Sequence, residues 1–158
     1  MFDAGTTTAV KVGDIAPNFE LSNQFGEPVS LHSLRGAPVV VVFYPFAFSR
    51  VCTSEMCELR DNLADFAALD ARVLAISVDS KFTLRAYAAE ENLNFELLAD
   101  FWPHGAVASQ FGAFDPKRGM AGRFSFIIDA DGVVRAVIAS PPGESRPLDR
   151  YRQALAAL

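Results

Sequence analysis

Residues 39–52 read VVVVFYPFAFSRVC and join an apolar run to a cysteine through a short segment that begins at Pro45. A near-continuous apolar run is typical of a central parallel strand that is covered on both faces, so we predict a buried strand over residues 38–45. The proline ends this strand, because its ring fixes the chain direction and removes a backbone donor. The stretch therefore predicts a strand and a short loop that leads to Cys52.

A helix is predicted directly after this loop. Apolar side chains recur at helical spacing, which indicates an amphipathic helix over residues 51–69. These side chains are Cys52, Met56, Leu59, Leu63 and Phe66. The unpaired N–H groups and the positive dipole end of a helix favour anions, and the thiolate is the reactive form of a cysteine. A thiol at this position therefore indicates redox or nucleophilic chemistry.

The other apolar segments alternate between strand and helix patterns. Strands are predicted over residues 19–21, 29–31, 73–78, 95–98, 124–128 and 133–138. Helices are predicted over residues 81–92, 103–111 and 147–157. Residues 129–132, DADG, separate the last two strands and are a strong hairpin signal. This order predicts an α/β protein with a thioredoxin-like fold, in which a mixed central β-sheet is sandwiched by helices.

The composition indicates one ordinary domain over residues 1–158, long enough to bury a full core. The net charge of −5 gives no reason to expect a nucleic-acid partner, and no apolar run approaches the length that spans a membrane. Residues 1–8 lack the basic start and the apolar core of a secretory signal, so we expect a cytoplasmic protein. The two cysteines do not form a disulfide scaffold and are either reactive or inert.

Cys52 considered by itself has two interpretations. A free cysteine on an apolar helix face is often a small core residue, and Cys52 shares its face with Met56. Its neighbours favour chemistry instead. Ser49, three residues earlier, is placed to cap the helix, and its hydroxyl can face the same pocket as the sulfur.

The spacing of Pro45, Ser49 and Cys52 resembles the peroxiredoxin pattern Pro-x-x-x-Thr/Ser-x-x-Cys. The resemblance extends along most of the chain. Residues 13–19, GDIAPNF, are similar to the opening segment of this family, and residues 52–55, CTSE, resemble its Cys-x-x-Glu. Residues 100–105, DFWPHG, are similar to a segment of the AhpE-type group.

The resemblance implies a role for each residue of the pattern. Cys52 would be the peroxidatic thiolate that becomes a sulfenic acid. Ser49 would hydrogen-bond to the thiolate and to the peroxide, and Pro45 would shield the sulfur from water. Arg123 matches the family's distant arginine, which would stabilise the thiolate and orient the peroxide, and Glu55 would hold that arginine. Without the resemblance, Arg123 reads as a solvated charge at the end of a strand.

The implied activity is a thiol-dependent peroxidase that reduces hydrogen peroxide and organic hydroperoxides without a cofactor, in antioxidant defence and redox homeostasis. The reductant would be a thioredoxin-, glutaredoxin- or mycoredoxin-like protein or a low-molecular-weight thiol. Two other functions stay open. One is a thioredoxin-like thiol–disulfide oxidoreductase, against which the lack of Cys-x-x-Cys argues, and the other is a non-enzymatic thioredoxin-fold binding module in which Cys52 only packs.

Cys57 leaves the recycling step open. It lies five residues after Cys52, the spacing of the resolving cysteine in PrxQ-type members, whereas the AhpE-type resemblance implies a one-cysteine enzyme. Five residues of helix rise about 7.5 Å, beyond the limit of roughly 7 Å between the Cα atoms of a disulfide. Cys57 is therefore either a resolving cysteine that requires local unwinding or a cysteine without a redox role. Residues 143–147, GESRP, resemble the C-terminal segment in which typical two-cysteine members carry their resolving cysteine. Arg146 stands there in this chain, so the disulfide between subunits that those members form is excluded.

Metal binding is not expected. His32 and His104 are the only histidines, and neither lies at ligand spacing from a cysteine. Phe101 and Trp102 are either partly buried core residues or an interface patch, and the second interpretation would make the protein a homodimer.

Overall fold

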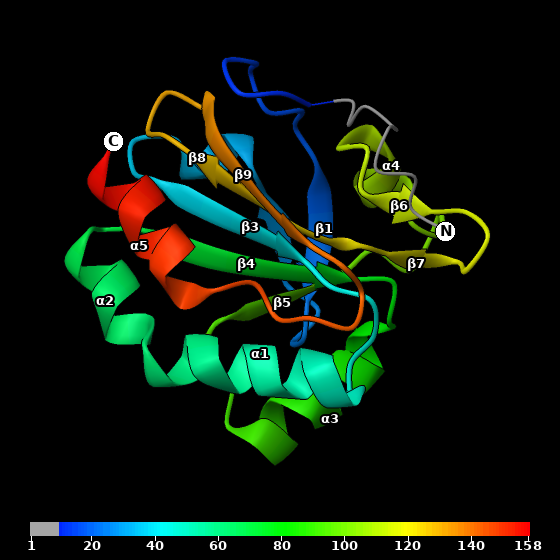
Figure 1. Cartoon of the computed structure of the whole chain (residues 1–158). Coiled ribbons are helices and arrows are strands. Elements are labelled where there is room, and N and C mark those ends of the chain that lie inside the picture. The colour runs from blue at the N-terminus through cyan, green and yellow to red at the C-terminus, as the bar shows by residue number, and fades with distance from the viewer. Residues whose placement is uncertain (1–9) are drawn as a thin grey trace.

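The structure is a computed structural model that describes residues 10–158 (Figure 1). Residues 1–8, on which the expectation of a cytoplasmic protein rests, lie outside this part. The strands are β1 Glu20–Asn23, β2 Pro28–Ser30, β3 Val39–Phe43, β4 Arg72–Ser77, β5 Glu96–Ala99, β6 Phe114–Asp115, β7 Met120–Ala121, β8 Arg123–Ile128 and β9 Val134–Ser140. The helices are η1 His32–Leu34, α1 Arg50–Asp61, α2 Leu63–Ala68, α3 Lys81–Glu91, α4 Ala106–Gln110 and α5 Leu148–Ala156.

The strand predicted from the apolar run is central in the sheet. Within residues 10–158, seven strands form one mixed sheet in the order β2-β1-β5-β4-β3-β8-β9. β3 is parallel to β4 and antiparallel to β8, and β4 is parallel to β5. The carboxyl ends of β3 and β4 therefore lie at the same edge of the sheet, and the loop that leads to Cys52 starts there.

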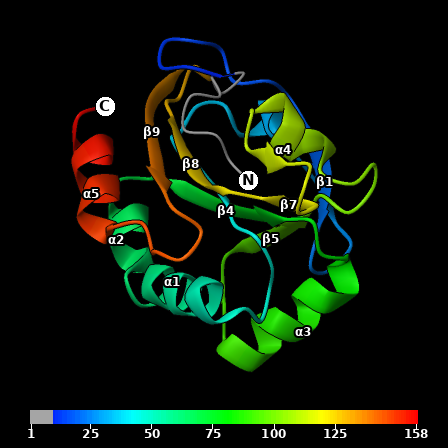
Figure 2. The ribbon, with the colours of Figure 1, turned by 45° about the vertical axis from the view of Figure 1, so that its right-hand side comes forward.

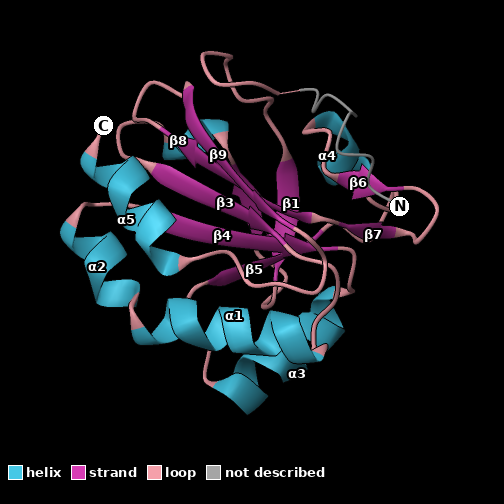
Figure 3. Cartoon of the chain, viewed as in Figure 1, coloured by secondary structure: helices cyan, strands magenta, loops and turns pink. Residues whose placement is uncertain are grey.

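β3 contributes to two hydrophobic cores, because successive side chains of a strand point to opposite faces. Val40 and Val42 pack on the face covered by α1, α2, α3 and α5, whereas Val41 and Phe43 pack on the face covered by α4. Figure 2 shows α5, α2, α1 and α3 in an arc on one side of the sheet and α4 on the other. Figure 3 shows the strands enclosed between these helices. The predicted mixed sheet sandwiched by helices is confirmed.

The prediction of one helix over residues 51–69 is wrong, because two helices occupy this range. α1 ends at Asp61, and α2 begins at Leu63. Asn62 between them has φ −116° and ψ 16°, and its side-chain amide donates a hydrogen bond to the Glu58 carbonyl at 2.9 Å. Asparagine side chains compete with the helical backbone in this way, so the apolar stripe continues across a break.

The helix predicted over residues 103–111 is shorter than expected, because α4 begins only at Ala106. Gly105 precedes it with φ +69°, and a Cβ there would collide with the ring of Phe114. The patterns do not predict η1 or the hairpin of β6 and β7, which are only two or three residues long. The hairpin predicted at residues 129–132 is confirmed, since β8 and β9 pair antiparallel around it.

Among residues 10–158, no helix has both the length and the apolar character needed to cross a bilayer.

Candidate active site

Cys52 lies at the third position of α1 and is completely buried. The chain reaches it from the carboxyl end of β3 through Pro45, which is also buried. The loop is attached to the neighbouring strand, because the Ala47 N–H donates a hydrogen bond to Asp79 Oδ2 at 2.8 Å just beyond the end of β4. The parallel pairing of β3 and β4 therefore fixes both the loop and the cysteine that follows it.

Arg123 reaches Cys52 from the first residue of β8. Because β8 runs antiparallel to β3, with Ser125 opposite Val42, the start of β8 lies at the edge of the sheet where β3 ends. Arg123 Nη2 lies 3.2 Å from Cys52 Sγ, and Arg123 Nε donates to the Pro142 carbonyl at 2.7 Å. Arg123 is buried, so its interpretation as a solvated charge is wrong.

Glu55 connects Arg123 to a second arginine. Its Oε1 accepts hydrogen bonds from Arg123 Nη1 at 2.9 Å and from Arg146 Nη2 at 2.7 Å. Its Oε2 accepts from the backbone N–H and the Nε of Arg146, at 2.8 and 2.9 Å. Burial alone would raise the pKa of Glu55, but the hydrogen bonds and the charge of Arg146, together with the charge of Arg123, hold this pKa below its ordinary value.

Arg146 is the residue that the sequence patterns miss. It is 1% exposed, and its Nη1 donates to the Phe43 carbonyl at 2.7 Å and to Ser125 Oγ at 3.0 Å. It thus connects the last residue of β3, the middle of β8 and Glu55 of α1. The sequence indicates only that no cysteine stands at this position, because a single arginine in a polar loop has no periodic pattern that would indicate burial.

Ser49 occupies the N-cap position of α1, but its side chain does not cap the helix. Its backbone is extended, with φ −71° and ψ 148°, and its carbonyl accepts the Thr53 N–H at 2.8 Å. The hydroxyl instead donates to the Phe46 carbonyl at 3.0 Å. The expectation of a side-chain cap is therefore wrong, because the carbonyl of the preceding loop takes the hydroxyl proton.

Cys57 lies on the same continuous helix as Cys52 and contacts a different neighbour. Both cysteines are free thiols in this structure. Cys57 is half-buried, and its Sγ donates to Glu91 Oε2 of α3 at 3.4 Å. Burial and this hydrogen bond raise the pKa of the Cys57 thiol. In the folded helix, Cys57 therefore contacts α3.

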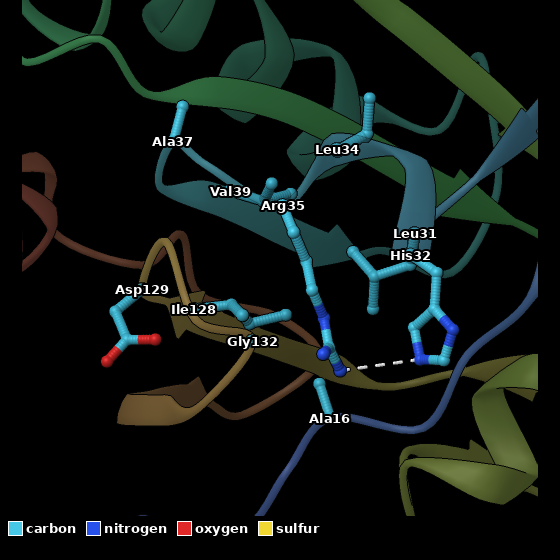
Figure 4. A pocket seen from close by; sticks show the side chains of 10 residues that line it. All are labelled: Ala16, Leu31, His32, Leu34, Arg35, Ala37, Val39, Ile128, Asp129 and Gly132. Atoms are coloured by element: carbon cyan, nitrogen blue, oxygen red, sulfur yellow. Dashed lines mark hydrogen bonds between the residues drawn. The ribbon is translucent and has the colours of Figure 1, made fainter.

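The two histidines lie in unrelated environments. His104 bonds through Nε2 to the Gly119 carbonyl at 2.7 Å. His32 lies 3.4 Å from Arg35 at the rim of a small pocket, which Figure 4 shows beside Val39 and Gly132. Val39 begins β3, so this pocket lies at the opposite end of that strand from Cys52. Within residues 10–158, no three His, Cys, Asp or Glu side chains gather as a metal site would require.

Comparison with known proteins assigns the family. Residues 12–137 match the model of the AhpC/TSA family, and the chain belongs to this family. It is 41% identical over 150 residues to alkyl hydroperoxide reductase E of Mycobacterium tuberculosis (strain ATCC 25618 / H37Rv), which covers 94% of this chain and 98% of that protein. It is 42% identical over 134 residues to peroxiredoxin Bcp of Escherichia coli (strain K12), which covers 81% of this chain and 85% of that protein.

Solved structures agree with this assignment. The crystal structure of peroxidoxin BcpB from Mycobacterium tuberculosis has a TM-score of 0.83 at 34% identity, and the match covers 94% of this chain and 98% of that one. The crystal structure of AhpC from Enterococcus faecalis has a TM-score of 0.87 at 28% identity, with 94% and 92% covered. The thioredoxin-like fold and the peroxiredoxin resemblance are confirmed. The protein is a thiol-dependent peroxidase, an enzyme that reduces peroxides with electrons from thiols.

Proposed function

We propose that Cys52 is the peroxidatic cysteine and that Arg123 orients the peroxide in front of it. The 3.2 Å contact between Arg123 Nη2 and Cys52 Sγ carries this proposal. The thiolate attacks one peroxide oxygen, an S–O bond forms and the O–O bond breaks. Cys52 becomes a sulfenic acid, and the other oxygen takes up a proton and leaves as water or an alcohol.

The buried charges around the sulfur support attack by a thiolate. Two guanidinium groups, those of Arg123 and Arg146, face the single carboxylate of Glu55. Buried charges are tolerated when they are paired, and a thiolate supplies the second negative charge of this group. The guanidinium of Arg123 also offers N–H donors in a rigid fork, which suits the two adjacent oxygens of a peroxide as charge develops on the leaving oxygen.

Three neighbours support this reaction. The hydroxyl of Ser49 is a rotatable group with one proton and two lone pairs, so it can turn from the Phe46 carbonyl to the sulfur or the peroxide. Pro45 is buried and keeps water from the sulfur. Glu55 holds the guanidinium of Arg123 in the orientation that contacts Cys52.

We assign hydrogen peroxide and organic hydroperoxides as substrates, in antioxidant defence and redox homeostasis. The relative named alkyl hydroperoxide reductase E supports an organic substrate. Phe46 and Phe48 in the loop before Cys52 are 39% and 51% exposed, and they offer apolar surface to the organic part of a hydroperoxide.

For recycling, we propose that Cys57 attacks the sulfenic acid and that an external thiol then reduces the disulfide. The donor would be a thioredoxin-, glutaredoxin- or mycoredoxin-like protein or a low-molecular-weight thiol, and two free thiols suit the reducing conditions of the cytoplasm.

Phe101 and Trp102 are 52% and 80% exposed, which supports a homodimer through this patch and not a core role for these side chains.

The experiment follows peroxide consumption by the fully reduced protein in a stopped-flow instrument. We expect one equivalent to be consumed rapidly by the wild type and none by Cys52→Ser, because a serine hydroxyl is a far poorer nucleophile near neutral pH. Rapid consumption by the serine variant would show that Cys52 is not the reacting residue.

A further inference from the structure

One face of α3 contacts the helix that carries both cysteines. Tyr87 donates a hydrogen bond from its hydroxyl to Thr53 Oγ1 at 3.2 Å, and Glu91 accepts the Cys57 thiol at 3.4 Å. The Glu91 carbonyl also accepts Arg60 Nη1 at 2.6 Å. Residues four apart lie on the same side of a helix. Tyr87 and Glu91, which we call the α3 clamp, therefore contact α1 from its first turn to its last.

Tyr87 holds the chain on both sides of Cys52. Its ring packs against Phe48, with 4.9 Å between ring centroids, and its hydroxyl bonds to Thr53. Phe48 lies in the loop four residues before the cysteine, and Thr53 follows the cysteine directly. Tyr87 is completely buried, and burial raises its pKa, so the phenol keeps the proton that it donates.

The contact with α3 opposes formation of a disulfide within α1. Cys52 and Cys57 are both within the regular helix Arg50–Asp61. Their Cα atoms are separated by five helical residues, or about 7.5 Å, which exceeds the reach of a disulfide. Bond formation therefore requires the helix to unwind between them, and unwinding breaks the contacts of Thr53 with Tyr87 and of Cys57 with Glu91.

We propose that the α3 clamp holds α1 closed while Cys52 reacts with peroxide, and that its release sets the rate at which Cys57 resolves the sulfenic acid. This inference rests on the proposed resolving role of Cys57. In the step that the clamp delays, the Cys57 thiolate attacks Cys52 Sγ, the S–S bond forms and the S–O bond breaks. The hydroxide that leaves combines with the Cys57 proton to give water. Tyr87 is a positioning residue that acts through Phe48 and Thr53, whereas Glu91 contacts the attacking sulfur of Cys57 directly.

Glu91 also acts on the protonation of Cys57. The charged and titratable groups that face Cys57 are Glu91 and Tyr87 from α3 and Arg60 and Asp61 from α1. The carboxylate of Glu91 favours the thiol, whereas the guanidinium of Arg60 favours the thiolate. Removing the Glu91 charge therefore moves the ionisation of Cys57 to lower pH, an effect that a general loosening of α1 would not produce.

The test mixes fully reduced protein with stoichiometric hydrogen peroxide, quenches with an alkylating reagent and follows the Cys52 sulfenic acid and the disulfide by mass spectrometry. The variants are Tyr87→Phe, which keeps the ring on Phe48, and Glu91→Ala. We expect disulfide formation to be about threefold to tenfold faster in each, the effect of losing one hydrogen bond. The reaction of Glu91→Ala with peroxide should stay within about twofold of wild type. Glu90→Ala, at an exposed position of the same helix, is the matched control and should match the wild type.

Two further readouts separate positioning from general destabilisation. Glu91→Gln keeps an acceptor for the thiol, so we expect a smaller rate increase than in Glu91→Ala, with the pH midpoint of the disulfide step below that of wild type. Amide hydrogen exchange of the reduced protein should be faster over residues 50–57 in Tyr87→Phe and Glu91→Ala than in wild type or Glu90→Ala.

The proposed role of the α3 clamp would be overturned if Tyr87→Phe and Glu91→Ala both formed the disulfide at the wild-type rate, or if both showed wild-type amide exchange over residues 50–57. A wild type that forms no disulfide between Cys52 and Cys57 would overturn the resolving role, and the clamp with it. That result comes from the wild type alone, so the two failures are distinguishable.

Discussion

Both carboxylate oxygens of Glu55 accept hydrogen bonds from Arg146, which donates from its backbone N–H, Nε and Nη2 at 2.8, 2.9 and 2.7 Å. Arg123 shares the same carboxylate at 2.9 Å and contacts Cys52 with its other terminal nitrogen. The orientation of the group that contacts the sulfur therefore depends on an arginine 91 residues away from Glu55 along the chain.

Removing Arg146 should destabilise the protein and slow its chemistry. Arg146→Met leaves Glu55 with a buried charge and one remaining cationic partner, and breaking a buried pair costs about 3–5 kcal/mol. We expect this loss in the free energy of unfolding measured by urea denaturation, together with slower peroxide reduction. Arg150→Met, at an exposed position of α5, is the control and should change stability by less than about 0.5 kcal/mol. Equal stabilities of the two variants would contradict a central role for Arg146.

Glu55 should make stability depend on pH at the acid end. Its pKa in the folded protein is below its ordinary value of 4.5, so the unfolded chain binds the proton more tightly. Such a group contributes its full stabilisation above the unfolded pKa and loses it as the pH falls through the folded pKa. The advantage of wild type over Glu55→Gln in urea denaturation should be constant above about pH 6 and shrink below pH 4.5. An advantage that is independent of pH would show that Glu55 acts by packing and not by charge.

Arg123 should dominate the rate of peroxide reduction. Arg123→Ala removes a preorganised cation next to Cys52, and losses of this kind slow reactions by about 100-fold or more. Arg123→Lys should recover little, because a point charge cannot contact Glu55 and the sulfur in the fork geometry of a guanidinium. Stopped-flow measurement of the second-order rate constant tests both variants. A rate equal to wild type in Arg123→Ala would assign the role to another cation.

The central part of the fold and site could be predicted because its residues carry local patterns. The apolar run of β3 indicates a strand buried on both faces, and the turn at residues 129–132 indicates a hairpin. Only the family pattern indicates Arg123, since its position next to Cys52 depends on the antiparallel pairing of β8 with β3. The residues that surround Arg123 in the sequence do not indicate which distant strand β8 pairs with.

Other features could not be predicted because single side chains decide them. Arg146 is buried by partners from three elements, and nothing in its polar neighbourhood indicates burial. The break between α1 and α2 depends on whether the amide of Asn62 bonds to the Glu58 carbonyl or points into solvent. The Ser49 hydroxyl has two alternative partners, a backbone N–H of α1 and the Phe46 carbonyl, and in this loop it bonds to the carbonyl.

Peroxide treatment of the wild type should form a disulfide between Cys52 and Cys57. Thiol titration should then fall from the two groups of the reduced protein to none. Because the helix must unwind to form this bond, amide exchange should become faster over residues 52–58 of α1, the segment that contains both cysteines. Mass spectrometry of the unreduced protein identifies the bond. A persistent sulfenic acid on Cys52 with Cys57 still free would instead support a one-cysteine enzyme, in which an external thiol attacks Cys52 directly.

Cys57→Ser should expose the sulfenic acid to further oxidation. Without the second thiol, Cys52 cannot be resolved within the chain, so its sulfenic acid should be long-lived and convert readily to the sulfinic form at excess peroxide. The first reaction with peroxide should proceed at nearly the wild-type rate, because Cys57 contacts Glu91 and not the guanidinium of Arg123. Mass spectrometry over a peroxide series counts the oxygens added to Cys52 in each protein. Equal accumulation of the sulfinic form in wild type and Cys57→Ser would show that Cys57 gives Cys52 no protection and has no resolving role.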